Sequence, residues 1–246
     1  GEEGLRKFCD FQQNDTNEFS FQRLLEMPQL QASFENRDYL FPEDREIIKK
    51  LGLSFRGKNA WPLFRSFTPG FAPWFISSSE ARFLAHALVQ TMEVSVRAME
   101  DPSILMPDGD DTYLLRRSFK TGDALQWQDV TWRESDPKPQ VYNISLDTIT
   151  IEKFNALPPR QAAIEIDVFM SPAAVHEKNS RPYYPYVVLI IETKRGMIVG
   201  SELIPPLPDL KAMWEKVPYH IVKTLIKKSL KPAKILTSSD LLYHLL

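Results

Sequence analysis

The feature that most constrains the fold is a strand hairpin in the second half of the chain. Residues 186–192, Tyr-Val-Val-Leu-Ile-Ile-Glu, form an apolar run of strand length, which is typical of a buried strand. Lys194-Arg195-Gly196 supplies a turn, and residues 197–204 return as the second strand. A hairpin is stable in water only when further strands or a helix pack on it. The sequence therefore predicts a sheet domain around these residues.

Further elements complete this C-terminal domain. A strand is predicted at 162–170, and a last short strand at 234–237. Between the hairpin and the last strand, a helix is predicted from Asp209 to about Ser229, bent or split at Pro218 because proline removes a helical hydrogen bond. The predicted order of elements is thus β-β-β-α-β, with a closing helical turn at 240–246.

A long helix is predicted in the first half, from about Ser79 to Met99. Ser77-x-x-Glu80 is a capping box, in which both side chains bind free backbone N–H groups of the first turn. Apolar or small residues then recur at helical spacing and predict one buried face, and these residues are Leu84, Leu88, Met92, Ser95 or Val96, and Met99.

Two strands and a linker follow this helix. Residues 113–119 and 125–133 are predicted to form a strand pair. The polar stretch 135–139, Ser-Asp-Pro-Lys-Pro, is the best linker candidate because its two prolines keep it extended. We therefore expect an α+β protein of two domains, 1–139 and 140–246. Each should be a small, mainly antiparallel sheet packed with one long helix.

The most distinctive run in the sequence lies at residues 61–76, Trp-Pro-Leu-Phe-Arg-Ser-Phe-Thr-Pro-Gly-Phe-Ala-Pro-Trp-Phe-Ile. It holds three prolines, one glycine and six aromatic residues. One interpretation is a core segment whose rings attach the long helix to the strands. The other is an exposed aromatic patch for a peptide, a base or a partner protein. The candidate binding residues of such a patch are Arg65, Phe67, Phe71 and Trp74.

The composition narrows the classes of partner and location. With 43% hydrophobic residues the chain can build a core, and its net charge of −2 gives no basic footprint for nucleic acid. No apolar run is long enough to span a membrane, and the N-terminus lacks a signal-peptide pattern. The single cysteine, Cys9, cannot form an internal disulfide. We expect a cytoplasmic protein without a cofactor, and a protein as its partner rather than nucleic acid or a membrane.

Three carboxylates in the C-terminal domain suggest a catalytic alternative. Asp167 lies in the first predicted strand, Glu215 in the helix and Asp240 after the last strand. This order resembles the first half of a ribonuclease H-like fold, in which carboxylates at such positions converge on two divalent metals for phosphodiester cleavage. No metal site is otherwise expected, and Asp167 and Asp240 would be its ligands if there were one. The simpler interpretation is an ordinary solvated carboxylate face.

The aromatic run is also the basis of a family resemblance. Together with Glu80 and the helix after it, Arg181-Pro182-Tyr183 before a strand and Gly196 in its hairpin, the run resembles a family of uncharacterised bacterial proteins. Those proteins carry two successive domains of unknown function. The resemblance covers about residues 50–246 and implies a bacterial source, but no activity and no catalytic residue.

The function is therefore left open between two classes. The leading hypothesis is a non-catalytic binding or interaction module, and it depends on residues 61–76 forming an exposed apolar patch. The alternative is a metal-dependent phosphodiester hydrolase, active or decayed, and it depends on Asp167, Glu215 and Asp240 lying together.

Overall fold

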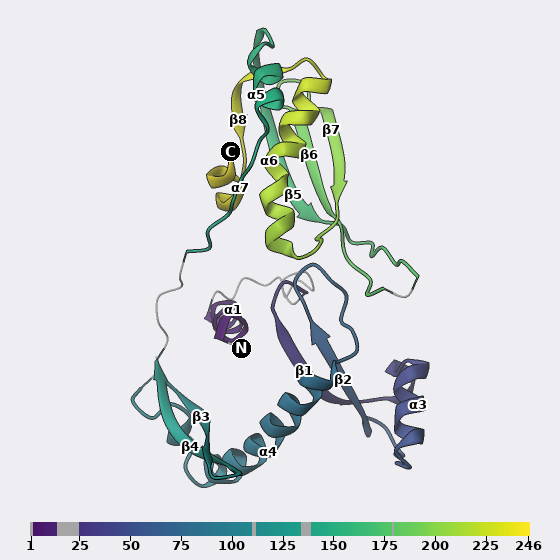
Figure 1. Ribbon diagram of the computed structural model, residues 1–246, viewed down its shortest axis with the longest axis vertical. Helices are drawn as coiled ribbons and strands as arrows, with labels where there is room; N and C mark the ends of the chain where they lie inside the picture. The colour runs from purple at the N-terminus through teal and green to yellow at the C-terminus, as the bar shows by residue number, and fades with distance from the viewer. Residues whose placement is uncertain (1, 14–24, 110–111, 134–138, 179) are drawn as a thin grey trace. The chain divides into compact units, whose positions relative to one another are not determined.

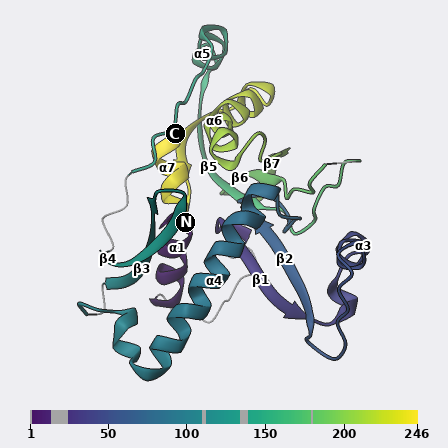
Figure 2. The same ribbon diagram turned by 60° about the horizontal axis from the view of Figure 1, so that its bottom comes forward.

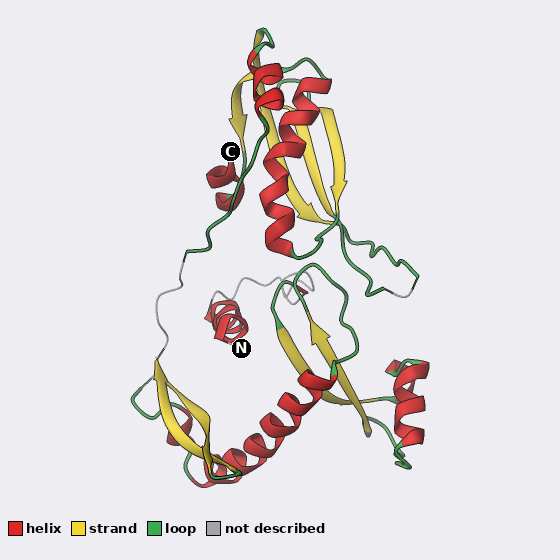
Figure 3. Cartoon of the chain, viewed as in Figure 1, coloured by secondary structure: helices red, strands yellow, loops and turns green. Residues whose placement is uncertain are grey.

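The part of the chain described by the computed structural model comprises residues 2–13, 25–109, 112–133, 139–178 and 180–246 (Figure 1). Helices and mainly antiparallel strands make it an α+β protein, as the sequence predicts. Within this part, the strands form two separate pairs and one four-stranded sheet (Figure 3). None of the helices described here combines the length and the apolar character that crossing a bilayer requires.

The chain divides into two compact units whose segments alternate along the sequence. The first unit consists of the segment with helix α1 (Glu2–Gln13), Leu30–Ser66 and Phe75–Pro139. The second unit consists of a short stretch that ends at Gln29, Phe67–Trp74 and Gln140–Leu246. Part of the aromatic and proline-rich run thus belongs to the same unit as the C-terminal sheet.

The second unit is built on a four-stranded sheet with the strand order β7-β6-β5-β8. Its elements are α5 (Thr148–Asn155), β5 (Pro159–Met170), β6 (Tyr186–Glu192), β7 (Met197–Ile204), α6 (Leu210–Lys227), β8 (Lys231–Leu236) and α7 (Asp240–Leu245). Strands β5, β6 and β7 are antiparallel, and β8 joins β5 in the parallel direction. The predicted order of three strands, a helix and a strand is found from β5 to β8.

Helix α6 covers one face of this sheet (Figure 1). Side chains alternate between the two faces of a strand, and Ile164, Ile166 and Ile190 point toward α6. They are buried in one cluster with Ile221 of that helix. The helix runs unbroken through Pro218, which is itself buried, so the predicted split at this proline does not occur.

The segment Phe67–Trp74 completes this core. Phe67 is 8% exposed and lies in the same buried cluster as the sheet residues. Gly70 has a φ of +83° and its carbonyl accepts a hydrogen bond from the N–H of Tyr184 at 2.8 Å. A Cβ at this position would lie 2.7 Å from Cβ of Pro206. Both the backbone conformation and the close approach therefore require glycine here.

The first unit contains shorter elements. They are α1, β1 (Gln29–Glu35), η1 (Arg37–Tyr39), α3 (Pro42–Lys50), β2 (Trp61–Phe67), α4 (Ser78–Glu100), η2 (Pro102–Leu105), β3 (Thr112–Thr121) and β4 (Ala124–Arg133). Strands β1 and β2 pair, and β3 and β4 form an antiparallel hairpin after the long helix α4 (Figure 2). Helix α4 begins with the predicted capping box, since Ser77 and Glu80 each accept the backbone N–H of the other.

Three elements of this unit were not expected from the sequence. Helix α1 and strand β1 lie in residues 1–40, where aromatic residues without a clean period predict irregular chain and one short helix near 21–27. Most of that predicted helix lies outside the described residues. Strand β2 occupies the start of the aromatic run, although Pro62 lacks the N–H that an interior strand needs. In a two-stranded sheet every strand is an edge, so this proline is tolerated.

Helix α4 also differs from its prediction in burial. Of its predicted buried face, Leu84 is 8% exposed. Leu88, Met92 and Met99 are instead 40%, 71% and 85% exposed. The prediction of one buried face is therefore wrong for most of this helix, because the elements of the first unit pack on its other side.

Candidate binding groove

The first unit contains a groove between α4 and the β3–β4 hairpin. Its volume is about 1050 Å³, which is enough for a drug-sized molecule. Its lining is mainly apolar and includes Phe83, Val94 and Ala98 of α4 and Tyr113, Leu115 and Trp127 of the hairpin. Polar side chains, among them Gln90 and Arg116, also reach the lining.

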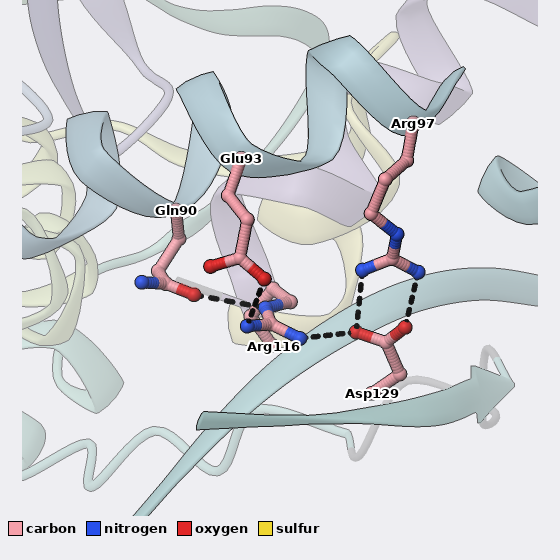
Figure 4. Close-up of polar contacts among 5 residues, drawn as sticks. All are labelled: Gln90, Glu93, Arg97, Arg116 and Asp129. Carbon is pink, nitrogen blue, oxygen red and sulfur yellow. Dashed lines mark hydrogen bonds and ion pairs between the residues drawn. The ribbon is translucent and has the colours of Figure 1, made fainter. Parts of the chain in front are cut away.

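A polar network at this groove connects α4 to the hairpin (Figure 4). The guanidinium of Arg116 on β3 donates to Oε1 of Gln90 and Oε1 of Glu93 on α4, both at 2.8 Å. It also donates to Oδ1 of Asp129 on β4 at 2.5 Å. Arg97 of α4 donates to both oxygens of the same Asp129 carboxylate. The Arg116 side chain is only 13% exposed, whereas Glu93, Arg97 and Asp129 remain in contact with water.

The pairing register of β3 with β4 brings Arg116 and Asp129 together as an ion pair. Arg116 and Asp129 are directly opposite each other on β3 and β4, and opposite charges at facing positions stabilise a strand pair. The guanidinium of Arg97, and then that of Arg116, lower the pKa of the Asp129 carboxyl because they favour its ionised form. Ionised Asp129 therefore holds the hairpin to α4 through Arg97.

The charges of this network cancel within it. Arg97 and Arg116 contribute two positive charges, and Glu93 and Asp129 contribute two negative ones. Each of the three guanidinium nitrogens of Arg116 already donates to a side chain of the network. The network therefore contributes no unpaired charge to the groove, whose lining is mainly apolar.

Arg65, the first candidate of the aromatic run, is held inside the first unit. Its side chain is 6% exposed and donates to both carboxylate oxygens of Asp44, at 2.9 and 2.6 Å. Its guanidinium also lies over the rings of Phe41 and Phe75, 4.8 and 5.2 Å from their centroids. Arg65 is thus part of a buried ion pair and is not accessible to a partner.

The other three candidates of the run lie in the second unit. Phe67 is in the buried core, and Trp74 lies against His176 with ring centroids 6.4 Å apart. Phe71 is bridged to Tyr183, with ring centroids 6.5 Å apart. Phe67 is thus buried, whereas Phe71 and Trp74 are half-buried in these contacts, and a binding role for them stays a prediction.

The three carboxylates of the hydrolase hypothesis are not brought together. Asp167 points to the face of the sheet opposite α6, since its neighbour Ile166 packs under that helix. Glu215 lies on α6 itself, where it accepts the N–H of Asn143 at 2.9 Å. Asp240 is an exposed residue at the start of α7. Within the described ranges, no group of three or more His, Cys, Asp or Glu side chains is placed to hold a metal ion.

The groove residues are absent from the sequence-based candidates. The strand pair was predicted at the right place, but without a register. The register is what pairs Arg116 with Asp129, because the two residues are equally far from the tight turn between Thr121 and Ala124. A count outward from that turn is the signal that could have found the pair.

The comparisons with known proteins assign the chain to two domains without a known function. Residues 1–116 match the family model of a domain of unknown function (DUF7309), and residues 150–246 match that of a second one (DUF6930). The chain therefore carries two successive domains of unknown function, as its resemblance implies, while the bacterial source stays a prediction. No curated protein and no solved structure was found to match the chain.

Proposed function

We propose that the chain is a non-catalytic binding module whose first unit takes up an apolar small molecule in the groove between α4 and the β3–β4 hairpin. The observation that carries the proposal is a groove of about 1050 Å³ with a mainly apolar lining. Ligand sites in proteins are typically apolar hollows of this size with a few polar groups that set orientation.

Two further observations support this choice. Of the two arginines in the lining, Arg116 and Arg117, the first has its charge balanced by Glu93 and Asp129, so an anionic ligand gains little from Arg116. The groove also lies between two elements that ion pairs connect, so both of its walls are present before a ligand binds. A preformed hollow binds an apolar ligand without the cost of ordering its own walls.

Titration with the uncharged fluorescent dye Nile red tests the proposal. Leu115→Asp places a charge on the hairpin wall and should weaken dye binding about tenfold, the effect of one lost leucine contact. Ala98→Phe fills the groove from the α4 side and should do the same without adding a charge. The matched control is Ile47→Asp on α3, at a side chain that is 53% exposed and outside the groove. Equal dye affinity in all four proteins would overturn the proposal.

A further inference from the structure

Helix α4 carries a second apolar face with the spacing of a helix–helix interface. Its positions follow one another in alternating steps of four and three residues, and they are Ala81, Ala85, Leu88, Met92, Ser95 and Met99. Steps of four and three are the a and d positions of a heptad repeat, which pack against a partner helix. We call this face the α4 seam. Val89 and Val96 extend it along one edge.

Most of the α4 seam is left exposed by the described residues of the first unit. Met92, Val96 and Met99 are 71%, 62% and 85% exposed. Helical side chains advance by about 100° per residue, so Met92 lies half a turn away from Phe83, which lines the groove. The groove thus faces mainly the side of α4 that Phe83 is on, and the seam residues Ser95 and Met99 also reach its lining.

The first unit has little buried apolar surface of its own. Within its described residues the buried apolar side chains are Leu40, Ile48 and Leu84. An apolar face of this length, left in water on a unit with so small a core, is typical of an interaction surface. Because its positions have heptad spacing, we expect the seam to bind an apolar helix.

Charges at the two ends of the seam indicate which helix that is. Arg82 and Glu100 are exposed and form no ion pair in the described part of the chain. They are 18 residues apart, which is about five helical turns, so both side chains lie along the same edge of the seam. A partner helix that runs in the opposite direction and carries the same residues would place a glutamate beside each Arg82.

We propose that the α4 seam is a homodimer interface in which two copies of α4 pack antiparallel. A two-fold axis near residue 90 brings Ala81 against the partner's Met99 and Leu88 against the partner's Met92. The smallest seam residue thus faces the longest one, which lets the two helices approach evenly. Arg82 then lies within about 3 Å of the partner's Glu100 along the helix axis. A parallel pair would instead separate Arg82 from the partner's Glu100 by about 27 Å along the helix axis, so this ion pair could not form.

Charge reversal with sedimentation velocity tests both the partner and the direction. Arg82→Glu and Glu100→Arg each convert two attractive pairs of the dimer into two repulsive ones. Each should therefore raise the dimer Kd about tenfold. The double variant Arg82→Glu/Glu100→Arg restores the pairs with reversed polarity and should return the Kd to the wild-type value. A wild-type chain that stays monomeric up to about 100 µM, or a double variant weaker than both single ones, would overturn the proposal.

A second set of variants tests the apolar part of the interface. Met92→Lys should abolish dimerisation while leaving the monomer folded, because the side chain it replaces is 71% exposed. The control on the same helix is Phe83→Lys, whose side chain is 65% exposed and faces away from the seam. Phe83→Lys should dimerise like the wild type. Equal sedimentation of the two lysine variants would contradict the seam as the interface.

Cysteine cross-linking then reports the direction of the helices. In a Cys9→Ser background, Val89→Cys lies beside the two-fold axis and should form a disulfide-linked dimer on oxidation. Met99→Cys should not, because an antiparallel pair separates the two copies of residue 99 by about 27 Å along the axis. Cross-linking of Met99→Cys in place of Val89→Cys would show a parallel pair and overturn the antiparallel arrangement.

Discussion

Gly200 shows how closely strand and helix approach in the second unit. It lies on β7, opposite Ile190 of β6 and beside a register shift between these strands. A Cβ at Gly200 would lie 2.4 Å from Cγ2 of Thr224 on α6. Such a distance is not compatible with two carbon atoms, so the absence of a side chain is what lets α6 lie this close to the sheet.

Substitution of Gly200 should therefore destabilise the second unit in a way that a second substitution reverses. Gly200→Ala should lower the free energy of unfolding by about 1–3 kcal/mol, as overpacking in a core does. Thr224→Ser removes only the Cγ2 methyl, and the next atom, Cβ of Thr224, lies at an ordinary 3.8 Å. In urea unfolding, Gly200→Ala/Thr224→Ser should regain most of the lost stability. A double variant that is less stable than Gly200→Ala would contradict this explanation.

At the scale of elements, the Asp129 carboxylate is one of the groups that connect the hairpin to α4. Asp129 receives Arg97 from the helix and Arg116 from the neighbouring strand. Its pKa is lowered in the folded state, chiefly by the bond from Arg97. Between that lowered pKa and the unfolded value of about 3.9, the unfolded chain binds more protons than the folded one. The stabilisation from Asp129 is therefore present above this window and is lost as the pH falls through the lowered pKa.

A comparison of wild type with Asp129→Asn isolates this contribution from those of the other carboxylates. The difference in urea midpoint between the two proteins should be widest near neutral pH and should shrink as the pH falls below about 4. Tryptophan fluorescence can follow the transition, since Trp127 lies on the hairpin. A difference that is the same at acid and neutral pH would show that the ionisation of Asp129 does not hold the hairpin.

The elements differ in how well the sequence predicts them, for reasons that are local. Strands β6 and β7 were predicted residue for residue, because a continuous apolar run and a glycine turn define both ends. Helix α4 was predicted to within a residue by the capping box at Ser77. Strand β2 was missed because it contains a proline and shows no alternation, whereas β1 was missed although Leu30, Ala32 and Phe34 alternate with polar residues along it.

The functional candidates were less predictable than the helices and strands. They depend on the register between strands and on the face of the sheet to which each side chain points. The ion pair of Arg116 with Asp129 follows only from the exact pairing of β3 with β4. The order of elements suggested that Asp167 and Glu215 converge. Convergence also requires that Asp167 point toward α6, and the alternation along β5 points it away.

At the scale of the whole molecule, the segment Phe67–Trp74 ties the core of the second unit to an early part of the chain. Phe67 is buried with Ile164 and Ile190, whereas Phe64 of the same strand is 37% exposed. The stability of the C-terminal sheet should thus depend on a residue about a hundred positions upstream of it. Phe67 lies in the first matched domain, 1–116, whereas Ile164 and Ile190 lie in the second, 150–246.

Alanine substitution on this strand should separate the two environments. Phe67→Ala should destabilise the second unit by about 3–5 kcal/mol, the usual effect of removing a buried phenylalanine. Phe64→Ala is the matched control and should have a much smaller effect. Hydrogen exchange identifies the unit concerned, since the amides of β5 and β6 should lose protection in Phe67→Ala. Loss of protection confined to β3 and β4 would contradict the placement of Phe67 in the second core.

Because segments of the two units alternate along the chain, the parts of the second unit are synthesised at different times. The side chain of Arg181 donates to the hydroxyl of Thr68 at 2.7 Å across 113 residues. A ribosome adds about 5–20 residues per second, so Thr68 leaves it several seconds before Arg181 is made. During that interval the rings of Phe67 and Phe71 have no sheet to cover them. The second unit therefore closes only after Arg181 has been made, and a chaperone that recognises apolar segments could bind residues 67–74 in the meantime.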